Sequence, residues 1–164
     1  AWRNEFWPQA GGYPTHAMQN LTLNEGELKP QWSADIGDGG SDGLPLTAQP
    51  VVADGKLFTL DSRGRLSAFD AASGRPLWQV YAGSEKEKEP VIAGGVAYSR
   101  GQLYVTNGYN EVLAVSPANG KPLWRKNISA PARAAPTVAE DRLFVVTLDN
   151  RLIALSVKDG TFLW

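Results

Sequence analysis

The chain has 164 residues, of which 43% are hydrophobic and 20% charged, and its formal net charge is −1. This length is enough to bury the core of one domain, and the near-neutral charge gives no strong field that would attract nucleic acid or an anionic membrane surface. The absence of cysteine excludes disulfides, thiolate metal sites and cysteine nucleophiles.

The first part of the chain shows no regular pattern, and we expect an irregular N-terminal arm over residues 1–27. Residues 28–36, which include Trp32, are typical of a lone β-strand that closes a ring with the last unit of a longer protein. Short β-rich runs separated by turn residues follow, and each group of four runs predicts an antiparallel meander. The three predicted meanders cover residues 47–82, 95–128 and 135–164.

The three meanders are copies of one repeat that ends in tryptophan. Trp78, Trp124 and Trp164 are separated by 46 and 40 positions, and Trp32 lies 46 positions before Trp78. A four-stranded repeat of about 40–45 residues is typical of a β-propeller blade, so the sequence predicts an all-β propeller. Because propellers close with about 4–8 blades, we expect this chain to be an incomplete one.

The tryptophan motif has a packing explanation. A large indole on the outer strand can cover the neighbouring blade and the turn before it. The Asp or Ser that precedes each turn can accept hydrogen bonds from turn amides, and Gly accepts a positive φ, which makes Asn119-Gly120 and Asp159-Gly160 strong hairpin dipeptides. We therefore interpret the motif as structural, with the residues Trp32, Asp70, Gly74, Trp78, Ser116, Gly120, Trp124, Ser156, Gly160 and Trp164.

The phrase from Ala68 to Trp78 resembles the tryptophan-docking motif of PQQ-like propellers. The phrases Trp7–Met18 and Leu148–Leu155 are similar to the BamB family of outer-membrane assembly factors. This resemblance implies about three blades of a probable eight-bladed periplasmic lipoprotein, anchored to the inner face of the outer membrane. It also implies a non-catalytic scaffold of the BAM complex, with a BamA-like assembly protein and nascent β-barrel chains as partners.

The motif also occurs in quinoprotein dehydrogenases, which hold PQQ and Ca²⁺, and in propeller sensor or interaction domains, and these alternatives stay open. The sequence shows no convergent set of Asp, Glu and Asn for such a site, and the single histidine, His16, cannot form a metal cluster or a triad. We therefore expect no catalytic residue, cofactor or metal. Scattered basic residues give no reason to expect a nucleic-acid partner, and we expect no small-molecule substrate.

The connection that leads into the third predicted blade is the candidate partner-binding segment. It is apolar, it is stiffened by proline, and its aliphatic residue beside an arginine is typical of an interface hot spot. In the BamB family a connection at about this place contacts a periplasmic domain of BamA. By position the contact residues would be Ile128, Ala130, Pro131 and Arg133. The other interpretation is an ordinary linker that covers a blade edge. We also expect open blade edges to promote self-association.

Overall fold

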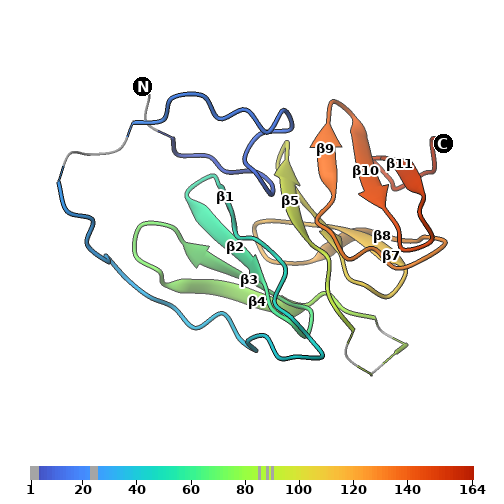
Figure 1. Cartoon of the computed structure of the whole chain (residues 1–164), viewed down its shortest axis with the longest axis horizontal. Coiled ribbons are helices and arrows are strands. Elements are labelled where there is room, and N and C mark those ends of the chain that lie inside the picture. The colour runs from blue at the N-terminus through green and yellow to red at the C-terminus, as the bar shows by residue number, and fades with distance from the viewer. Residues whose placement is uncertain (1–3, 23–25, 85, 88, 90) are drawn as a thin grey trace.

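A computed structural model shows the protein as three antiparallel β-sheets that lie side by side (Figure 1). It describes residues 4–22, 26–84, 86, 87, 89 and 91–164. Within these residues there are eleven strands and no helix, which confirms the all-β prediction. The same part of the chain therefore holds no helix long and apolar enough to cross a membrane.

Each sheet is a meander whose strands follow one another in chain order. The first sheet contains β1 (Val51–Ala53), β2 (Lys56–Leu60), β3 (Arg65–Asp70) and β4 (Pro76–Tyr81). The second contains β5 (Gly95–Ser99), β6 (Gln102–Thr106), β7 (Glu111–Val115) and β8 (Pro122–Asn127). The third contains β9 (Thr137–Ala139), β10 (Arg142–Val146) and β11 (Leu152–Ser156). The sheets are the blades of an incomplete propeller, as the repeat predicts.

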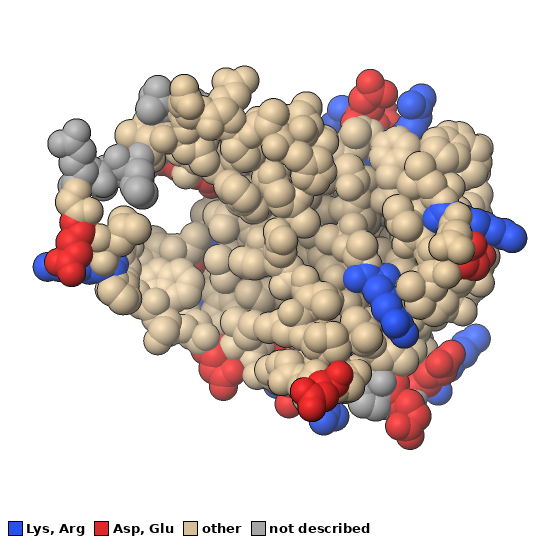
Figure 2. Space-filling model, in the orientation of Figure 1, with Lys and Arg blue, Asp and Glu red and all other residues tan. Residues whose placement is uncertain are grey.

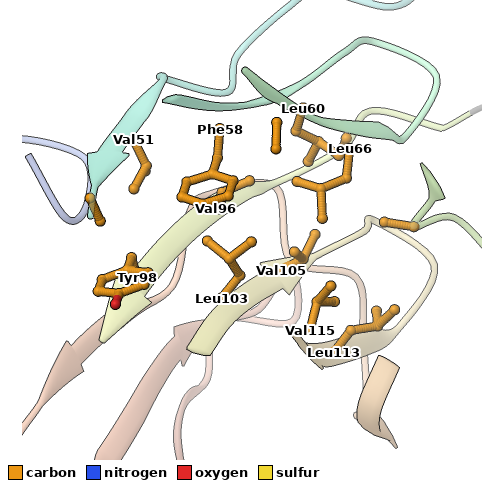
Figure 3. Packing of buried hydrophobic residues seen from close by; sticks show 14 residues of the cluster. Val51, Phe58, Leu60, Leu66, Val96, Tyr98, Leu103, Val105, Leu113 and Val115 are labelled. Atoms are coloured by element: carbon orange, nitrogen blue, oxygen red, sulfur yellow. The ribbon is translucent and has the colours of Figure 1, made fainter. Parts of the chain in front are cut away.

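Two hydrophobic clusters fill the spaces between neighbouring blades. In the first cluster, Phe58 from β2 packs with Leu103 from β6 between blades one and two (Figure 3). In the second, Tyr104 from β6 packs with Leu143 from β10 between blades two and three. Adjacent residues of a strand point to opposite faces of the sheet, so β6 contributes to both clusters. Each large side chain buried in this way contributes about 1.5–3 kcal/mol.

Three of the four motif tryptophans, Trp32, Trp78 and Trp124, dock on a turn of the blade that follows them in the chain. The Nε1 group of Trp78, in β4, donates to the carbonyl oxygen of Pro117 at 3.0 Å, and that of Trp124, in β8, donates to Val157 at 3.1 Å. Trp32 repeats the contact with a 3.3 Å bond to the carbonyl oxygen of Ala71. The same relationship therefore links each blade to the tryptophan-bearing segment that precedes it in the chain.

The turns that receive these tryptophans are longer than an Asn-Gly or Asp-Gly dipeptide hairpin. In the second blade, Ser116 N donates to Lys121 O at 2.9 Å, which encloses four residues, and Gly120 N returns to Ser116 O at 2.9 Å. Gly120 alone adopts a positive φ, at 74°, whereas Asn119 does not. The residue before the turn also contributes a side-chain contact, because Ser116 Oγ accepts the N–H of Ala118 at 3.3 Å.

The predicted strand at residues 28–36 is not formed. Exposure alternates from Gln31 to Asp35 as in a strand, but the segment belongs to no ladder. A strand requires ladder hydrogen bonds to a neighbouring backbone, and none of the described residues forms a ladder with this segment. It is held instead by the Trp32 side chain and by Asp38, whose N–H donates to the Asp61 carboxylate at 3.0 Å.

The third blade also differs from the prediction of four strands. Its outer part is limited to an isolated bridge between Leu155 and Phe162, next to a 2.9 Å bond from Ala154 N to Trp164 O. The Trp164 ring packs on Phe144 with the centroids 6.0 Å apart. This matches the 6.0 Å between Trp78 and Phe58 in the first blade.

The described residues of the N-terminal arm form none of the eleven strands, but they are part of the packed structure. It runs beside β1, β5 and β9, the first strands of the three blades (Figure 1). Pro8, Gln9 and Gly12 are buried, and Phe6 packs against the first hydrophobic cluster. Residues 1–3 and 23–25, which belong to the predicted arm, lie outside the described part of the chain.

Candidate partner-binding surface

The segment between β8 and β9 begins with a core residue. Ile128 is only 2% exposed and belongs to the cluster between the second and third blades. Its N–H donates to the carbonyl oxygen of Asn110 at 2.7 Å. Ala82, which lies 46 positions earlier in the repeat, is buried in the same way. The structure thus corrects the expectation that Ile128 is an exposed anchor, because this repeat position packs against the core.

The other three predicted contact residues reach the surface. Ala130 and Pro131 are half-buried and Arg133 is exposed. The carbonyl oxygen of Pro131 accepts the N–H of Leu148 at 2.8 Å, so the linker lies against the turn between β10 and β11. A linker fixed in this way presents its side chains in one arrangement and loses little conformational entropy when it binds a partner.

Two residues of this turn extend the surface and were not predicted. Leu148 is 48% exposed. Arg151 is also exposed, and its Nε lies 3.3 Å from the Asp149 carboxylate. An ion pair this open to solvent contributes at most about 1 kcal/mol, so the arginine can exchange its partner at little cost. We call the set Ala130, Pro131, Arg133, Leu148 and Arg151 the linker–turn surface.

Comparison of the three repeats in the sequence could have identified Leu148 as unusual. The equivalent residues of the first and second blades are Ser62 and Gly108, and both are small. A leucine at a turn position that elsewhere holds a small residue is a departure that the packing of the blade does not require. Together with Arg133 and Arg151 it gives the linker–turn surface one aliphatic side chain and two cations, which suits an apolar partner surface with carboxylates at its rim.

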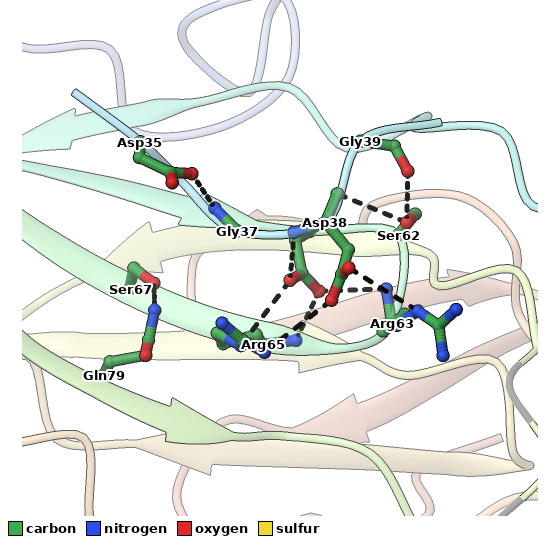
Figure 4. Close-up of polar contacts among 10 residues, drawn as sticks. Asp35, Gly37, Asp38, Gly39, Ser62, Arg63, Arg65, Ser67 and Gln79 are labelled. Atoms are coloured by element: carbon green, nitrogen blue, oxygen red, sulfur yellow. Dashed lines mark hydrogen bonds and ion pairs between the residues drawn. The ribbon is translucent and has the colours of Figure 1, made fainter. Parts of the chain in front are cut away.

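A second polar cluster lies at the turn between β2 and β3 (Figure 4). The buried carboxylate of Asp61 accepts the N–H groups of Asp38, Arg63 and Arg65 at 3.0, 2.9 and 2.8 Å. The guanidinium of Arg65 lies 3.7 Å from the same carboxylate. These bonds engage both carboxylate oxygens of Asp61. The cluster therefore holds the turn and the 28–46 segment together, which is a structural role.

The equivalent positions in the other blades have the same structural role. Asn107 Oδ1 accepts Tyr109 N at 3.0 Å, and its Nδ2 donates to Ala82 O at 3.1 Å. Thr147 Oγ1 donates to Arg151 O at 3.2 Å. Each of these side chains satisfies backbone groups near a turn.

A PQQ site with its Ca²⁺ requires several convergent oxygen ligands. Within the described residues no group of three or more His, Cys, Asp or Glu side chains could hold a metal ion. The described residues therefore do not by themselves fit such a site, and no reaction step follows from them. On the face shown in Figure 2, acidic and basic side chains are mixed around the rim and the centre is largely uncharged.

Comparison with known proteins gives a consistent family. The family model described as "Outer membrane protein assembly factor BamB" matches residues 19–100 and 62–164. The outer membrane protein assembly factor BamB of Shewanella oneidensis is 31% identical over 156 residues, which covers 90% of this chain and 39% of that protein. The quinoprotein alcohol dehydrogenase PedH of Pseudomonas putida is 36% identical over 77 residues, which covers 45% of this chain and 13% of that protein.

Solved structures support the fold. A quinohemoprotein alcohol dehydrogenase from Comamonas testosteroni superimposes with a TM-score of 0.80 at 22% identity, covering 100% of this chain and 27% of its own. BamB from Moraxella catarrhalis superimposes with a TM-score of 0.61 at 19% identity, covering 73% of this chain and 35% of its own. This chain spans about two fifths of the length of its Shewanella relative. Because the family model and the Shewanella relative match most of its length, the chain belongs to the BamB family of PQQ-like repeat propellers.

Proposed function

We propose that this chain is part of a non-catalytic periplasmic scaffold that assists the assembly of outer-membrane β-barrel proteins within a BAM-type complex. The observation that carries the proposal is the relative named as an outer membrane protein assembly factor, which matches 90% of the chain. In the longer protein, a lipid anchor would hold the scaffold at the inner face of the outer membrane.

The linker–turn surface is the docking site in this proposal, and its partner is a BamA-like assembly protein. Leu148 supplies the exposed apolar contact, and Arg133, two residues after Pro131, supplies a cation. The bond from Leu148 N to Pro131 O joins the two segments, so they dock as one rigid unit. An apolar residue at the centre of such an interface contributes about 2 kcal/mol or more to binding.

The outer strands of the blades are the second contact region, for nascent β-barrel chains. β4 and β8 are edge strands, and Leu77, Tyr81 and Leu123 on them are exposed. An extended chain can add to such an edge by backbone hydrogen bonds, with its alternate side chains resting on exposed apolar residues.

The test is a binding measurement between the full-length protein and the purified BamA-like protein of the same organism. Leu148→Asp should weaken binding by roughly thirtyfold, because it places a charge in the apolar centre. Leu28→Asp is the matched control, because Leu28 is exposed and lies outside the surface, and it should leave binding unchanged. Absence of binding by the unmodified protein, or equal effects of the two substitutions, contradicts the proposal.

The quinoprotein dehydrogenase function is the second candidate, and the observation in its favour is the 36% identity to PedH over 77 residues. Dye-linked alcohol oxidation by the full-length protein supplied with PQQ and Ca²⁺ separates the two. Oxidation would favour the dehydrogenase, whereas partner binding without oxidation supports the scaffold.

A further inference from the structure

Successive residues of the N-terminal arm bind the first strands of successive blades. Trp7 exchanges two backbone hydrogen bonds with Val52 of β1, at 2.7 Å from Trp7 N and 2.9 Å from Val52 N. The carbonyl oxygen of Pro8 then accepts the N–H of Tyr98, in β5, at 2.6 Å. The arm therefore adds to the first blade as a short antiparallel segment and continues directly to the second.

The third contact uses a side chain. Gln9 Oε1 accepts the N–H of Val138, in β9, at 3.0 Å. Gln9 is 3% exposed, so this bond is shielded from water. A buried donor left without a partner costs about 1–3 kcal/mol, which gives the amide of Gln9 a specific role.

The three N–H groups occupy equivalent positions of the repeat. Val52, Tyr98 and Val138 are separated by 46 and 40 positions, the same spacings that separate the tryptophans. Each lies in the inner edge strand of its sheet, where no further strand of the blade pairs with it. The blades thus present one backbone donor each, in a row, to whatever polypeptide lies along their inner edges.

We propose that this row of donors is a polypeptide-binding track whose resident ligand is the chain's own arm, and that the arm of a second copy binds there in exchange. The ligand is an extended, uncharged segment with two backbone carbonyls and one amide side chain in register. An aromatic residue precedes these three acceptor groups in the ligand. In the resident arm it is Phe6, whose ring packs edge-on against Tyr98 with the centroids 5.7 Å apart. This proposal is independent of the partner proposed above.

The connection between the arm and the blades permits the exchange. From Pro14 to Pro30 no described residue is buried. The arm can leave its own blades without exposing core residues of this connection, and a connection of this length reaches a neighbouring molecule. Exchange of an identical segment between copies preserves every contact of the closed form, which is why it is a low-cost route to association.

The first experiment measures binding of a fluorescent peptide with the sequence of residues 4–13 to the whole chain. The resident arm competes at a high effective concentration, so the unmodified chain should bind the peptide weakly. The double substitution Trp7→Pro and Gln9→Ala removes one donor and one acceptor from the resident arm. It should raise peptide affinity at least tenfold. A peptide with the same two changes should bind poorly, and Gln19→Ala, at an exposed glutamine of the connection, should have no effect.

The second experiment measures amide hydrogen exchange in Gln9→Ala alone, which keeps the backbone contacts of the arm. Exchange should accelerate at Val138 and change little at Val52, and added peptide should restore protection. If Val138 keeps its protection in Gln9→Ala, the assigned contact is wrong. If the arm is released and the peptide still does not bind, the arm is a fixed part of the fold and the track does not accept a second copy. If the double variant does not fold, Gln9→Ala still tests the exchange, because failure of added peptide to restore protection at Val138 would show that the track does not accept a second copy.

Discussion

The indole N–H of Trp78 donates to the carbonyl oxygen of Pro117 at 3.0 Å, which ties the outer strand of the first blade to a turn of the second. Trp124 and Val157 repeat this relationship one blade later. Each contact combines a hydrogen bond with the packing of a large ring, so these tryptophans set the spacing between blades.

Substitution of a docked tryptophan should be more costly than substitution of an undocked one. Trp78→Phe removes the hydrogen bond and part of the ring contact, and we expect a loss of about 1–3 kcal/mol in the free energy of unfolding. Trp164→Phe is the control, since Trp164 is 62% exposed, and its effect should stay within about 0.5 kcal/mol. Urea unfolding of the two variants measures the difference, and equal losses would show that docking does not stabilise the fold.

Alanine at Gly120 should be strongly destabilising. Gly120 has φ 74°, and a Cβ there would lie 2.6 Å from Val80 Cγ1 and 2.9 Å from Trp78 Cε3. Gly101 has a similar φ of 78° with no atom within 4 Å of its Cβ position. Gly101→Ala therefore reports the backbone strain alone, about 1–2 kcal/mol, and Gly120→Ala adds the clash. Thermal unfolding of both variants tests this prediction. A larger fall in melting temperature for Gly101→Ala than for Gly120→Ala would contradict it.

Replacing Thr59 by valine should stabilise the protein. Thr59 is 6% exposed, and its buried hydroxyl has no hydrogen-bond partner. The equivalent positions of the second and third blades hold Val105 and Val145. Thr59→Val removes an unsatisfied hydroxyl without changing the shape, so we expect a gain of about 1 kcal/mol. Val105→Thr should give a loss of similar size. Chemical denaturation checks both, and a loss of stability in Thr59→Val would refute the assignment.

Two buried tyrosines should make stability fall at high pH. Burial, and then the neighbouring Asp54, raise the pKa of Tyr98 from 10.0 to about 12. Burial, and then its hydrogen bond with Tyr81, raise the pKa of Tyr109 to about 12. Between pH 10 and 12 the folded protein keeps protons that the unfolded chain has lost. The stabilisation from these groups is therefore complete below pH 10 and disappears as pH rises through 12. Tyr98→Phe should reduce this dependence and the double variant with Tyr109→Phe should remove most of it, as measured by unfolding at each pH. An unchanged pH slope in the double variant would contradict this explanation.

The open face of the third blade should promote self-association of this 164-residue chain. Leu152, in β11, is 53% exposed, whereas its equivalent Val112 is buried between the second and third blades. An apolar surface of this kind associates with other copies unless it is covered. Leu152→Lys should shift the chain toward monomer in analytical ultracentrifugation. Leu123→Lys, at an exposed leucine of the outer strand β8, should not, and the reverse order would place the contact on the outer edge.

The repeat made the blades predictable, because each copy carries its strands, its turn and its tryptophan at fixed spacing. The exact form of the turns was not predictable from Asn119-Gly120, since the same dipeptide is compatible with loops of different length. The lone strand at residues 28–36 was predicted from its tryptophan, but strand formation depends on a paired neighbour, which a local pattern does not reveal.

The partner-binding prediction shows a different limit. Ile128 was selected as an aliphatic residue in a linker, although its repeat position matches the buried Ala82. Leu148 was missed because it lies in a turn that looks ordinary by composition. The arm contacts could not be predicted because two of the three use backbone atoms, which leave no trace in the order of side chains.

The contact from Trp32 to Ala71 gives the array a polarity. The outer strands β4 and β8 each carry an indole that docks on a glycine turn of the next blade, so neighbouring blades join head to tail and not head to head. A heterologous contact of this kind closes into a ring when the rotation per unit divides a full circle, and otherwise it extends into an open spiral. A blade moved from one propeller of this repeat type into another should therefore fold in place only when its indole and its glycine turn are transferred together.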